Sequence, residues 1–234
     1  MIKQMFCIPY AGGSSAIFNG WKTEFGKELE VYPIEYAGHG RRMAEGFYTS
    51  VDQTAEDAAL QIKEKLRGDY VIYGHSMGCV VAYEAICLME KLGMPLPKAL
   101  IIGACRPRHL NYKRKCYGDM DRDELMRAVA EMGQLEDIVF EYPELYDIVA
   151  DMLYADFQML EKYKINSGVQ KIPVPIYAMS GTMDWEAPTE DVKEWKLYTD
   201  QTFEFREFEG NHFFSFKDKP EVWEHIRKIL SQVS

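Results

Sequence analysis

A serine that stands between two glycines is the residue of this sequence with the clearest potential for chemistry. Ser76 lies in G-H-S-M-G, after the apolar run Tyr70–Tyr73 and before a stretch with helical spacing that continues to about Leu92. A strand, a G-x-S-x-G turn and a helix in this order are typical of a nucleophile elbow, in which a strained turn exposes the serine Oγ. The alternative is an ordinary turn whose hydroxyl caps the helix. The flanking strand and helix favour a nucleophilic Ser76.

A histidine far downstream is the candidate base for this nucleophile. In the α/β-hydrolase arrangement the triad follows the chain order serine, acid, histidine, and the last two lie on loops after later strands. His212 follows the predicted strand Thr202–Phe208 in a Gly-Asn turn, whereas His225 lies inside the predicted helix Pro220–Leu230. The spacing therefore predicts His212 as the base and His225 as a structural or surface residue.

The acid that orients the base must also lie at the end of a strand. No carboxylate follows the predicted strand Ala99–Gly103, but Asp184 follows Val174–Ser180 on a G-T-M-D turn. A competing interpretation is that Asp184 only caps a helix that begins near Ala187. We predict that Asp184 is the acid of the triad.

A glycine-rich loop near the start of the chain is a candidate source of oxyanion donors. It comprises Pro9–Ser15 and follows the predicted strand Lys3–Ile8. In α/β-hydrolases such a loop supplies one backbone N–H, and the residue after the nucleophile supplies the other. These donors are predicted at Ala11, with Tyr10 as the neighbouring alternative, and at Met77. A phosphate-binding loop or a plain turn is the other interpretation, but the sequence lacks G-x-x-x-x-G-K-[ST] and G-x-G-x-x-G.

Neither a metal-binding set nor a cofactor lysine motif is visible in the sequence. The histidines lack the H-x-x-x-H type of spacing, and the five cysteines are scattered without C-x-x-C pairs. We therefore expect no metal and no cofactor, and free thiols in a reducing compartment. The chemistry that remains is acyl transfer through a serine ester, with water completing the turnover.

Strands and helices alternate along the chain and predict a single domain over residues 1–234. We expect an α/β-hydrolase fold, that is, a mostly parallel sheet flanked by helices with a helical lid insertion. The predicted strands are Lys3–Ile8, Leu29–Tyr36, Tyr70–Tyr73, Ala99–Gly103, Val174–Ser180 and Thr202–Phe208. Helices are predicted at about 16–25, 51–66, 77–92 and 220–230. Pro33 suggests that the second strand lies at an edge or bends.

A helical segment interrupts this alternation. Asp119–Lys164 has helical spacing and lies in an insertion that spans about 110–165. Several methionines and aromatic residues fall within it. Adaptable methionine side chains suit a lid over a flexible acyl chain. The alternative is that these side chains only pack the helices against one another.

The charge of the chain limits its partners. The formal net charge is −10 at pH 7, which disfavours general binding to nucleic acid or to an anionic membrane. No apolar run approaches the length of a spanning helix, and the opening residues lack a convincing secretory signal. We therefore expect a cytoplasmic protein, and nothing in the sequence demands an assembly larger than a monomer.

Two short basic segments oppose this net charge. Arg106–Lys115 and Arg41–Arg42 are most simply interpreted as solvated loops, and the alternative is that they dock an acidic partner. His39 lies beside the second segment. We expect it to be a solvated loop histidine rather than a residue that borders a substrate.

Four segments together resemble the type II thioesterases that accompany nonribosomal peptide and polyketide synthetases. They are FCIPYAGGSS, YGHSMGCVVAYE, SGTMD and EGNHFF, and the resemblance covers about residues 5–216. It implies that the substrates are acyl, aminoacyl or short peptidyl thioesters on the phosphopantetheine arm of carrier domains. Carried over by position, it also implies a triad of Ser76, Asp184 and His212 with oxyanion donors at Ala11 and Met77.

The chain departs from this family at a few positions. Ala37 stands before Gly38 where the family usually has proline, and Cys79 and Asn211 occupy sites that more often hold small residues. These departures concern loop geometry and chain-length preference. The alternative functions are a medium-chain acyl-carrier-protein thioesterase, a general carboxylesterase or lipase, and a hydrolase-like protein that binds a small hydrophobic ligand without turnover.

Overall fold

A single parallel sheet organises the molecule. The computed structural model describes residues 2–26, 28–113, 115–133, 135–163, 169–216 and 219–233. Within them, six strands pair in the order β2-β1-β3-β4-β5-β6, and every pairing is parallel. The strands are β1 (Gln4–Ile8), β2 (Glu30–Pro33), β3 (Tyr70–His75), β4 (Leu100–Gly103), β5 (Ile176–Gly181) and β6 (Phe203–Phe208). Each predicted strand is present, with its ends shifted by no more than three residues.

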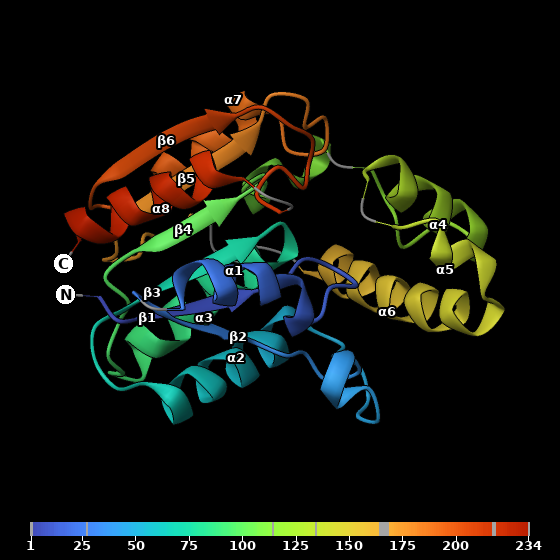
Figure 1. Cartoon of the computed structure of the whole chain (residues 1–234), viewed down its shortest axis with the longest axis horizontal. Helices are drawn as coiled ribbons and strands as arrows, with labels where there is room; N and C mark the ends of the chain where they lie inside the picture. The colour runs from blue at the N-terminus through green and yellow to red at the C-terminus, as the bar shows by residue number, and fades with distance from the viewer. Residues whose placement is uncertain are drawn as a thin grey trace.

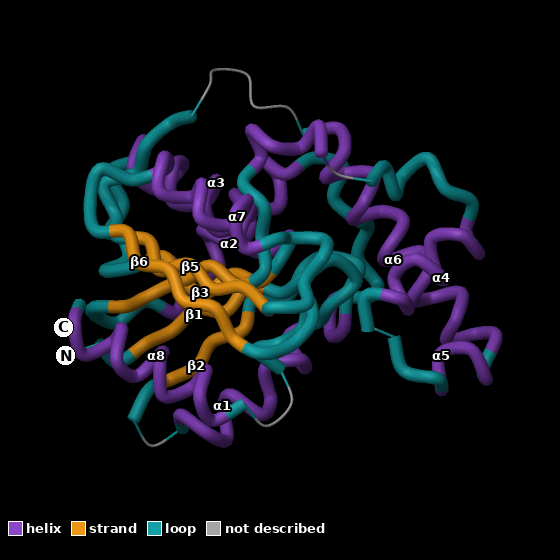
Figure 2. Tube along the Cα trace, turned by 90° about the horizontal axis from the view of Figure 1, so that it is seen from above, coloured by secondary structure: helices purple, strands orange, loops and turns teal. Residues whose placement is uncertain are grey.

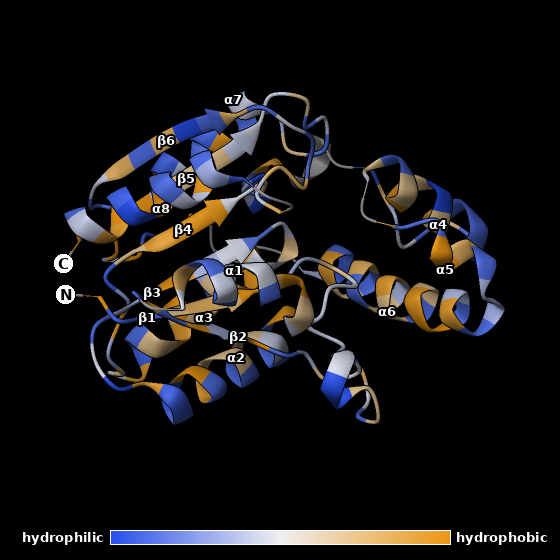
Figure 3. Cartoon of the chain, in the orientation of Figure 1, coloured by the Kyte–Doolittle hydropathy of each residue, from blue (hydrophilic) through white to orange (hydrophobic). Residues whose placement is uncertain are grey.

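The inner and outer strands differ in composition because helices cover both faces of the sheet. Strands β1, β3, β4 and β5 are buried along their whole length, as the near-continuous apolar runs of a covered parallel sheet require. Strand β2 lies at one edge and ends at Pro33, as predicted. Figure 3 shows the contrast between the hydrophobic β4 and the largely hydrophilic edge strand β6.

Two pairs of helices enclose the sheet. Helices α1 (Asn19–Phe25) and α8 (Pro220–Gln232) cover one face, and α2 (Val51–Lys65) and α3 (Met77–Lys91) cover the other (Figure 2). Each pair buries its own apolar cluster against the sheet. The predicted helix from Ala16 begins instead with a 3-10 turn, Ser15–Phe18, because the Ser14 hydroxyl accepts the N–H of Ala16.

A helical insertion separates β4 from β5. It contains a 3-10 helix (Arg108–Lys113) and then α4 (Arg122–Glu131), α5 (Ile138–Glu141) and α6 (Pro143–Lys162). A capping box between Asp121 and Glu124 starts α4, and Pro143 occupies the first turn of α6. These three helices lie beyond the carboxyl ends of the strands (Figure 1). Lys164, the predicted end of the helical segment, lies outside the described residues.

The remaining helices of the described residues are short. Helix α7 (Thr189–Val192) and a 3-10 helix (Lys193–Tyr198) connect β5 to β6, and another 3-10 helix (Gly40–Arg42) follows β2. In the part of the chain that the structure describes, no helix combines the length and the apolar character that crossing a membrane demands.

Candidate active site

The turn between β3 and α3 holds Ser76 in a strained conformation. Its φ of 52° and ψ of −117° lie outside the regions that a non-glycine residue usually adopts. A Cβ on Gly78 would lie 2.1 Å from the Ile8 carbonyl oxygen, and one on Gly74 would lie 2.5 Å from the Gly78 carbonyl oxygen. Gly78 therefore lets the elbow pack against the end of β1, and Gly74 lets β3 pack against the first turn of α3.

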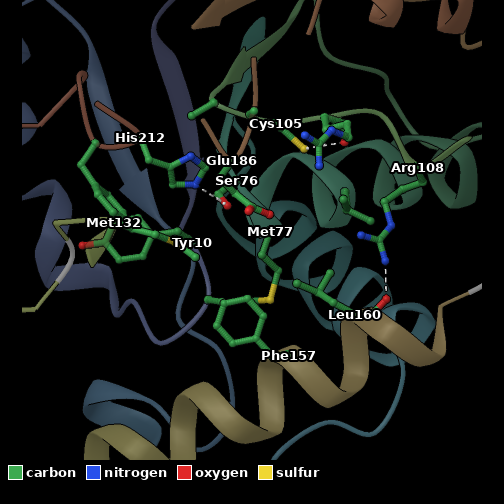
Figure 4. A pocket seen from close by; sticks show the side chains of 16 residues that line it. Tyr10, Ser76, Met77, Cys105, Arg108, Met132, Phe157, Leu160, Glu186 and His212 are labelled. Atoms are coloured by element: carbon green, nitrogen blue, oxygen red, sulfur yellow. Dashed lines mark hydrogen bonds between the residues drawn. The ribbon is translucent and has the colours of Figure 1, made fainter. Parts of the chain in front are cut away.

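A chain of hydrogen bonds joins the three predicted triad residues. His212 Nε2 lies 2.9 Å from Ser76 Oγ, and His212 Nδ1 lies 2.9 Å from Asp184 Oδ2 (Figure 4 shows the first of these bonds). An ionised carboxylate can only accept, so His212 Nδ1 carries a proton and Nε2 is the acceptor that faces the serine hydroxyl. In this arrangement the imidazole can accept the proton of Ser76.

Asp184 combines the two roles that the sequence presented as alternatives. Its Oδ2 contacts His212, while its Oδ1 accepts the backbone N–H groups of Glu186 and Ala187 at 3.0 and 2.9 Å. Burial raises the pKa of Asp184, but the charge and hydrogen bond of His212, together with the Ala187 N–H, bring that pKa below its ordinary value. The local turn therefore holds the carboxylate ionised and aimed at the imidazole.

The loops that carry Asp184 and His212 are bound to each other directly. The N–H of Thr182 donates to the Phe208 carbonyl at 2.8 Å, and the N–H of Met183 donates to the Gly210 carbonyl at 2.8 Å. Gly181 makes this close approach possible, since a Cβ there would lie 2.4 Å from the Asn211 carbonyl oxygen. Pairing of β5 with β6 thus continues into the loops and sets the separation of the two side chains.

His75, which the sequence analysis did not single out, contacts the backbone of the loop that carries His212. Its Nε2 lies 2.8 Å from the His212 carbonyl oxygen, and its Nδ1 lies 2.9 Å from the Tyr73 hydroxyl. Complete burial lowers the pKa of His75 to about 3, so the ring is neutral at neutral pH. Nε2 then donates to the carbonyl while Nδ1 accepts from Tyr73. Its position directly before Ser76 is the only sequence signal that points to it.

The glycine-rich loop closes the pocket around Ser76. Tyr10, Ala11 and Met77 all line this pocket together with Ser76 and His212. Met77 is the first residue of α3, where a backbone N–H has no partner within the helix. Both predicted donor positions and the Tyr10 alternative therefore border the same cavity as the nucleophile.

The helical insertion forms the opposite wall. Phe157 and Leu160 of α6 and Met132 after α4 line the pocket, and Figure 4 shows Met77 extending toward Phe157. The ring of Phe157 packs against Tyr117 with centroids 4.7 Å apart. A few of the apolar residues of the insertion thus face the nucleophile, while buried neighbours such as Leu153 pack the helices against one another.

The basic segment Arg106–Lys115 is not the solvated loop that its composition suggests. Arg106 pairs with Asp191 at 2.8 Å, and Arg108 is buried and donates from Nη2 to the Leu160 carbonyl (Figure 4). Both line the pocket, where Asp191 compensates the charge of Arg106 and a carbonyl in the last turn of α6 accepts a hydrogen bond from Arg108. Lys115 is exposed, and the side chains of residues 111–114 lie outside what the structure describes.

The residues of the second basic segment, and His39 beside it, differ in their exposure to solvent. The side chain of Arg41 is 78% exposed, as expected for a solvated loop, whereas Arg42 pairs with Asp57 and Glu45. The prediction for His39 is wrong: only 1% of the residue is exposed, and its Nε2 contacts Asp156 of α6 at 3.0 Å. The partner lies 117 residues away in the chain, so no local pattern signals this contact.

Comparisons with known proteins agree with this architecture. The family model for the thioesterase domain matches residues 3–230 of the chain. The chain is 31% identical to the probable anguibactin biosynthesis thioesterase AngT of Vibrio anguillarum over 232 residues, which cover 97% of this chain and 91% of AngT. It is 26% identical to the gramicidin S biosynthesis protein GrsT of Aneurinibacillus migulanus, over 98% of this chain and 90% of GrsT.

A solved structure of similar sequence has the same fold. RedJ, a thioesterase from the prodiginine biosynthetic pathway of Streptomyces coelicolor, superposes with a TM-score of 0.87 at 29% identity. The match covers 99% of this chain and 90% of RedJ. The predicted α/β-hydrolase fold is thereby confirmed.

Proposed function

This chain is a member of the thioesterase family, and we propose that it is a type II thioesterase of a nonribosomal peptide or polyketide pathway. In this role it hydrolyses acyl, aminoacyl or short peptidyl thioesters on the phosphopantetheine arm of carrier domains. The similarity to AngT, GrsT and RedJ supports a biosynthetic role, because the name of each states a biosynthesis or a biosynthetic pathway. YbtT, whose solved structure is 25% identical to this chain with a TM-score of 0.83, is described as a type II thioesterase from the yersiniabactin NRPS/PKS biosynthetic pathway. We also propose that it acts in the cytoplasm, since scattered cysteines without C-x-x-C pairs favour a reducing compartment, and that it acts as a monomer.

The observation that carries the proposal is the Ser76–His212–Asp184 chain of hydrogen bonds at the base of a pocket. His212 takes the proton of Ser76 as the serine oxygen attacks the thioester carbonyl. The N–H groups of Ala11 and Met77 stabilise the oxyanion of the tetrahedral intermediate. His212 then gives the proton to the departing thiolate, which leaves as the free pantetheine thiol. Asp184 keeps the imidazole oriented and stabilises its charged form.

Water completes the cycle by the same route. His212 removes a proton from a water molecule that attacks the Ser76 ester, and it returns that proton to the serine oxygen as the acid is released. A thioester is already activated toward nucleophiles, so the triad and two backbone donors suffice for this chemistry. The apolar wall formed by Met132, Phe157 and Leu160 suits the carbon chain of an acyl group.

Intact-protein mass spectrometry of a loaded carrier domain tests the proposal. A carrier bearing acetyl, aminoacyl or octanoyl pantetheine is incubated with the wild type and, separately, with Ser76→Ala. Loss of acyl mass with the wild type alone is the expected result. Fastest release of octanoyl would instead indicate a medium-chain acyl-carrier-protein thioesterase.

Two further outcomes would reject the proposal. Cleavage of simple oxygen esters with no loss from any carrier would indicate a general carboxylesterase. Failure of a fluorophosphonate to label Ser76 would indicate a binding protein without turnover.

A further inference from the structure

The predicted oxyanion loop is a tight turn whose central peptide is held by the insertion. Gly13 N–H donates to the Tyr10 carbonyl at 2.9 Å, and Gly12 has a φ of +73°, as the third residue of a type II turn requires. The Gly12 N–H donates to Asp156 Oδ2 at 2.7 Å. Asp156 belongs to α6, 144 residues further along the chain, and is only 6% exposed.

A buried histidine holds the same carboxylate oxygen. His39 Nε2 lies 3.0 Å from Asp156 Oδ2, and His39 Nδ1 lies 3.0 Å from the Ala37 carbonyl oxygen. Because a carbonyl and an ionised carboxylate both only accept, each ring nitrogen must donate, which makes the ring an imidazolium. Burial alone lowers the pKa of His39, but Asp156 raises it above its ordinary value. The result is a buried ion pair that fixes the carboxylate.

The body of the protein anchors the other end of the loop. Glu35, which follows β2, accepts the Ser15 N–H and the Ser15 hydroxyl at 2.7 Å each. This anchor does not involve the insertion. The loop is therefore held by Glu35 from the sheet side and by Asp156 from the side of α6.

We infer that Asp156, fixed by His39, is a positioning residue. It orders the oxyanion turn, that is, the turn Tyr10–Gly13 that contains the predicted donor Ala11, and it makes this order depend on the docking of α6. Type I and type II turns differ by a flip of the central peptide, which here is the Ala11–Gly12 unit. An acceptor at Asp156 selects the orientation in which the Gly12 N–H points to α6. The Ala11 N–H lies in the preceding Tyr10–Ala11 peptide and does not flip itself, but Ala11 is a corner residue of this turn, so loss of the acceptor loosens the setting of its N–H. A donor stabilises an oxyanion only when it is ordered before the reaction.

This inference rests on the proposed serine mechanism but not on the identity of the carrier. Its test therefore uses a carrier-free substrate, a hexanoyl N-acetylcysteamine thioester, and three variants of α6. Asp156→Ala removes the acceptor, Asp156→Asn keeps an acceptor oxygen without the charge, and Asp151→Asn is the matched control. Asp151 lies on the same helix but is exposed and pairs with Arg122 at the surface.

The expected result is a loss in kcat with little change in KM. We expect kcat to fall about 10–100-fold in Asp156→Ala and less in Asp156→Asn, because oxyanion donors act in the transition state. Affinity for a hexyl trifluoromethyl ketone, whose serine adduct places an oxyanion in the hole, falls in parallel. Asp151→Asn stays within about 2-fold of the wild type, as a surface pair implies.

Two results would overturn the inference. One is a lower melting temperature in Asp156→Ala with unchanged kcat and ketone affinity at low temperature, which would make the residue merely structural. The other, if Asp156→Ala does not fold, is an unchanged kcat in His39→Gln. The rate at which a fluorophosphonate labels Ser76 separates this inference from the proposed function. If the wild type is labelled but hydrolyses no thioester, the proposed function is contradicted. Slower labelling of Asp156→Asn than of the wild type would still support the positioning role.

Discussion

The pocket has two sides, and each contains a buried histidine that is not part of the triad. On the sheet side, His75 is neutral, because Nδ1 accepts from Tyr73 and Nε2 donates to the His212 carbonyl. On the side of the insertion, His39 donates from both nitrogens, to Ala37 and to Asp156. The same side chain thus serves as a neutral link in one place and as a buried cation in the other.

The difference reflects how each side is built. The sheet side is assembled at the ends of neighbouring parallel strands, where glycines such as Gly78 and Gly181 allow backbone groups to touch. Neutral hydrogen bonds from His75 suffice to hold the His212 loop there. The insertion approaches the sheet from outside, and a charged pair, Asp156 with His39, attaches it to the oxyanion turn. A buried ion pair fixes a specific geometry, but loss of one partner lowers the stability of the protein because the other charge is left buried and uncompensated.

The largest effect is expected from breaking the sheet side at its carboxylate. In Asp184→Asn the amide cannot act as the charged acceptor for His212 Nδ1, so the imidazole loses its orientation and its favoured tautomer. We expect kcat for thioester hydrolysis to fall about 10³–10⁴-fold with a folded protein. Single-turnover kinetics measure this loss, and a decrease below 10-fold would show that Asp184 serves only the local turn.

A smaller loss is expected from removing the neutral link. His75→Phe deletes the donor to the His212 carbonyl, which is left unsatisfied, whereas the Tyr73 hydroxyl keeps Ser215 Oγ as a partner at 2.9 Å. We expect kcat to fall about 10-fold and stability to fall by about 1–3 kcal/mol, the usual range for a buried group left unsatisfied. Tyr73→Phe is the control, because it keeps the bond from His75 to His212. Equal kcat losses in both variants would place the effect in packing rather than in the His212 loop.

Much of the sheet side was predictable because its signals are local. Ser76 directly follows β3, Asp184 and His212 lie in the loops after β5 and β6, and parallel strands bring their carboxyl ends to one edge. The apolar runs of the inner strands identified the sheet, since covered strands need continuous apolar character. The structure brings these three residues into hydrogen-bond contact, while their catalytic roles stay a prediction until activity is measured.

The other side of the pocket was less predictable, since its partners are distant in the chain. Nothing near His39 indicates a carboxylate on α6, and the composition around Arg108 resembles any solvated basic loop. Burial of a charge depends on a partner that only tertiary packing supplies. Helical spacing therefore identified a helical insertion but not the charged groups on its inner face.

The attachment of α6 gives a prediction for stability. Arg108 donates to the Leu160 carbonyl in the last turn of α6, and its guanidinium lies 5.2 Å from the centroid of the Tyr163 ring. Arg108→Met removes both contacts, so we expect the free energy of unfolding to fall by about 1–3 kcal/mol in urea. Arg122→Met, at a partly exposed surface pair, should change it by under about 1 kcal/mol. Equal losses would contradict a specific role for the buried arginine.

The smallest effect concerns the charge of His39 and sharpens the contrast with His75. Burial lowers the pKa of His39, but the hydrogen bond and charge of Asp156, with a further contribution from Glu35, raise it above its ordinary value. A raised pKa in the folded state means that the stabilisation is fully present below about pH 6.5 and is lost as pH rises through the folded value.

The free energy of unfolding is measured in urea from pH 6 to pH 9 for the wild type and for His39→Gln. The difference between the two isolates the contribution of the His39 charge to stability. The stability difference between the wild type and His39→Gln should shrink as the pH rises, because deprotonation removes one donor and leaves the ionised Asp156 without a cationic partner.

For His75, whose pKa is lowered to about 3 by burial, the stability difference between the wild type and His75→Gln should instead shrink as the pH falls below about 6.5. If both differences changed in the same direction with pH, the two histidines would share one protonation state. The two sides of the pocket would then not differ in the way that their hydrogen bonds indicate.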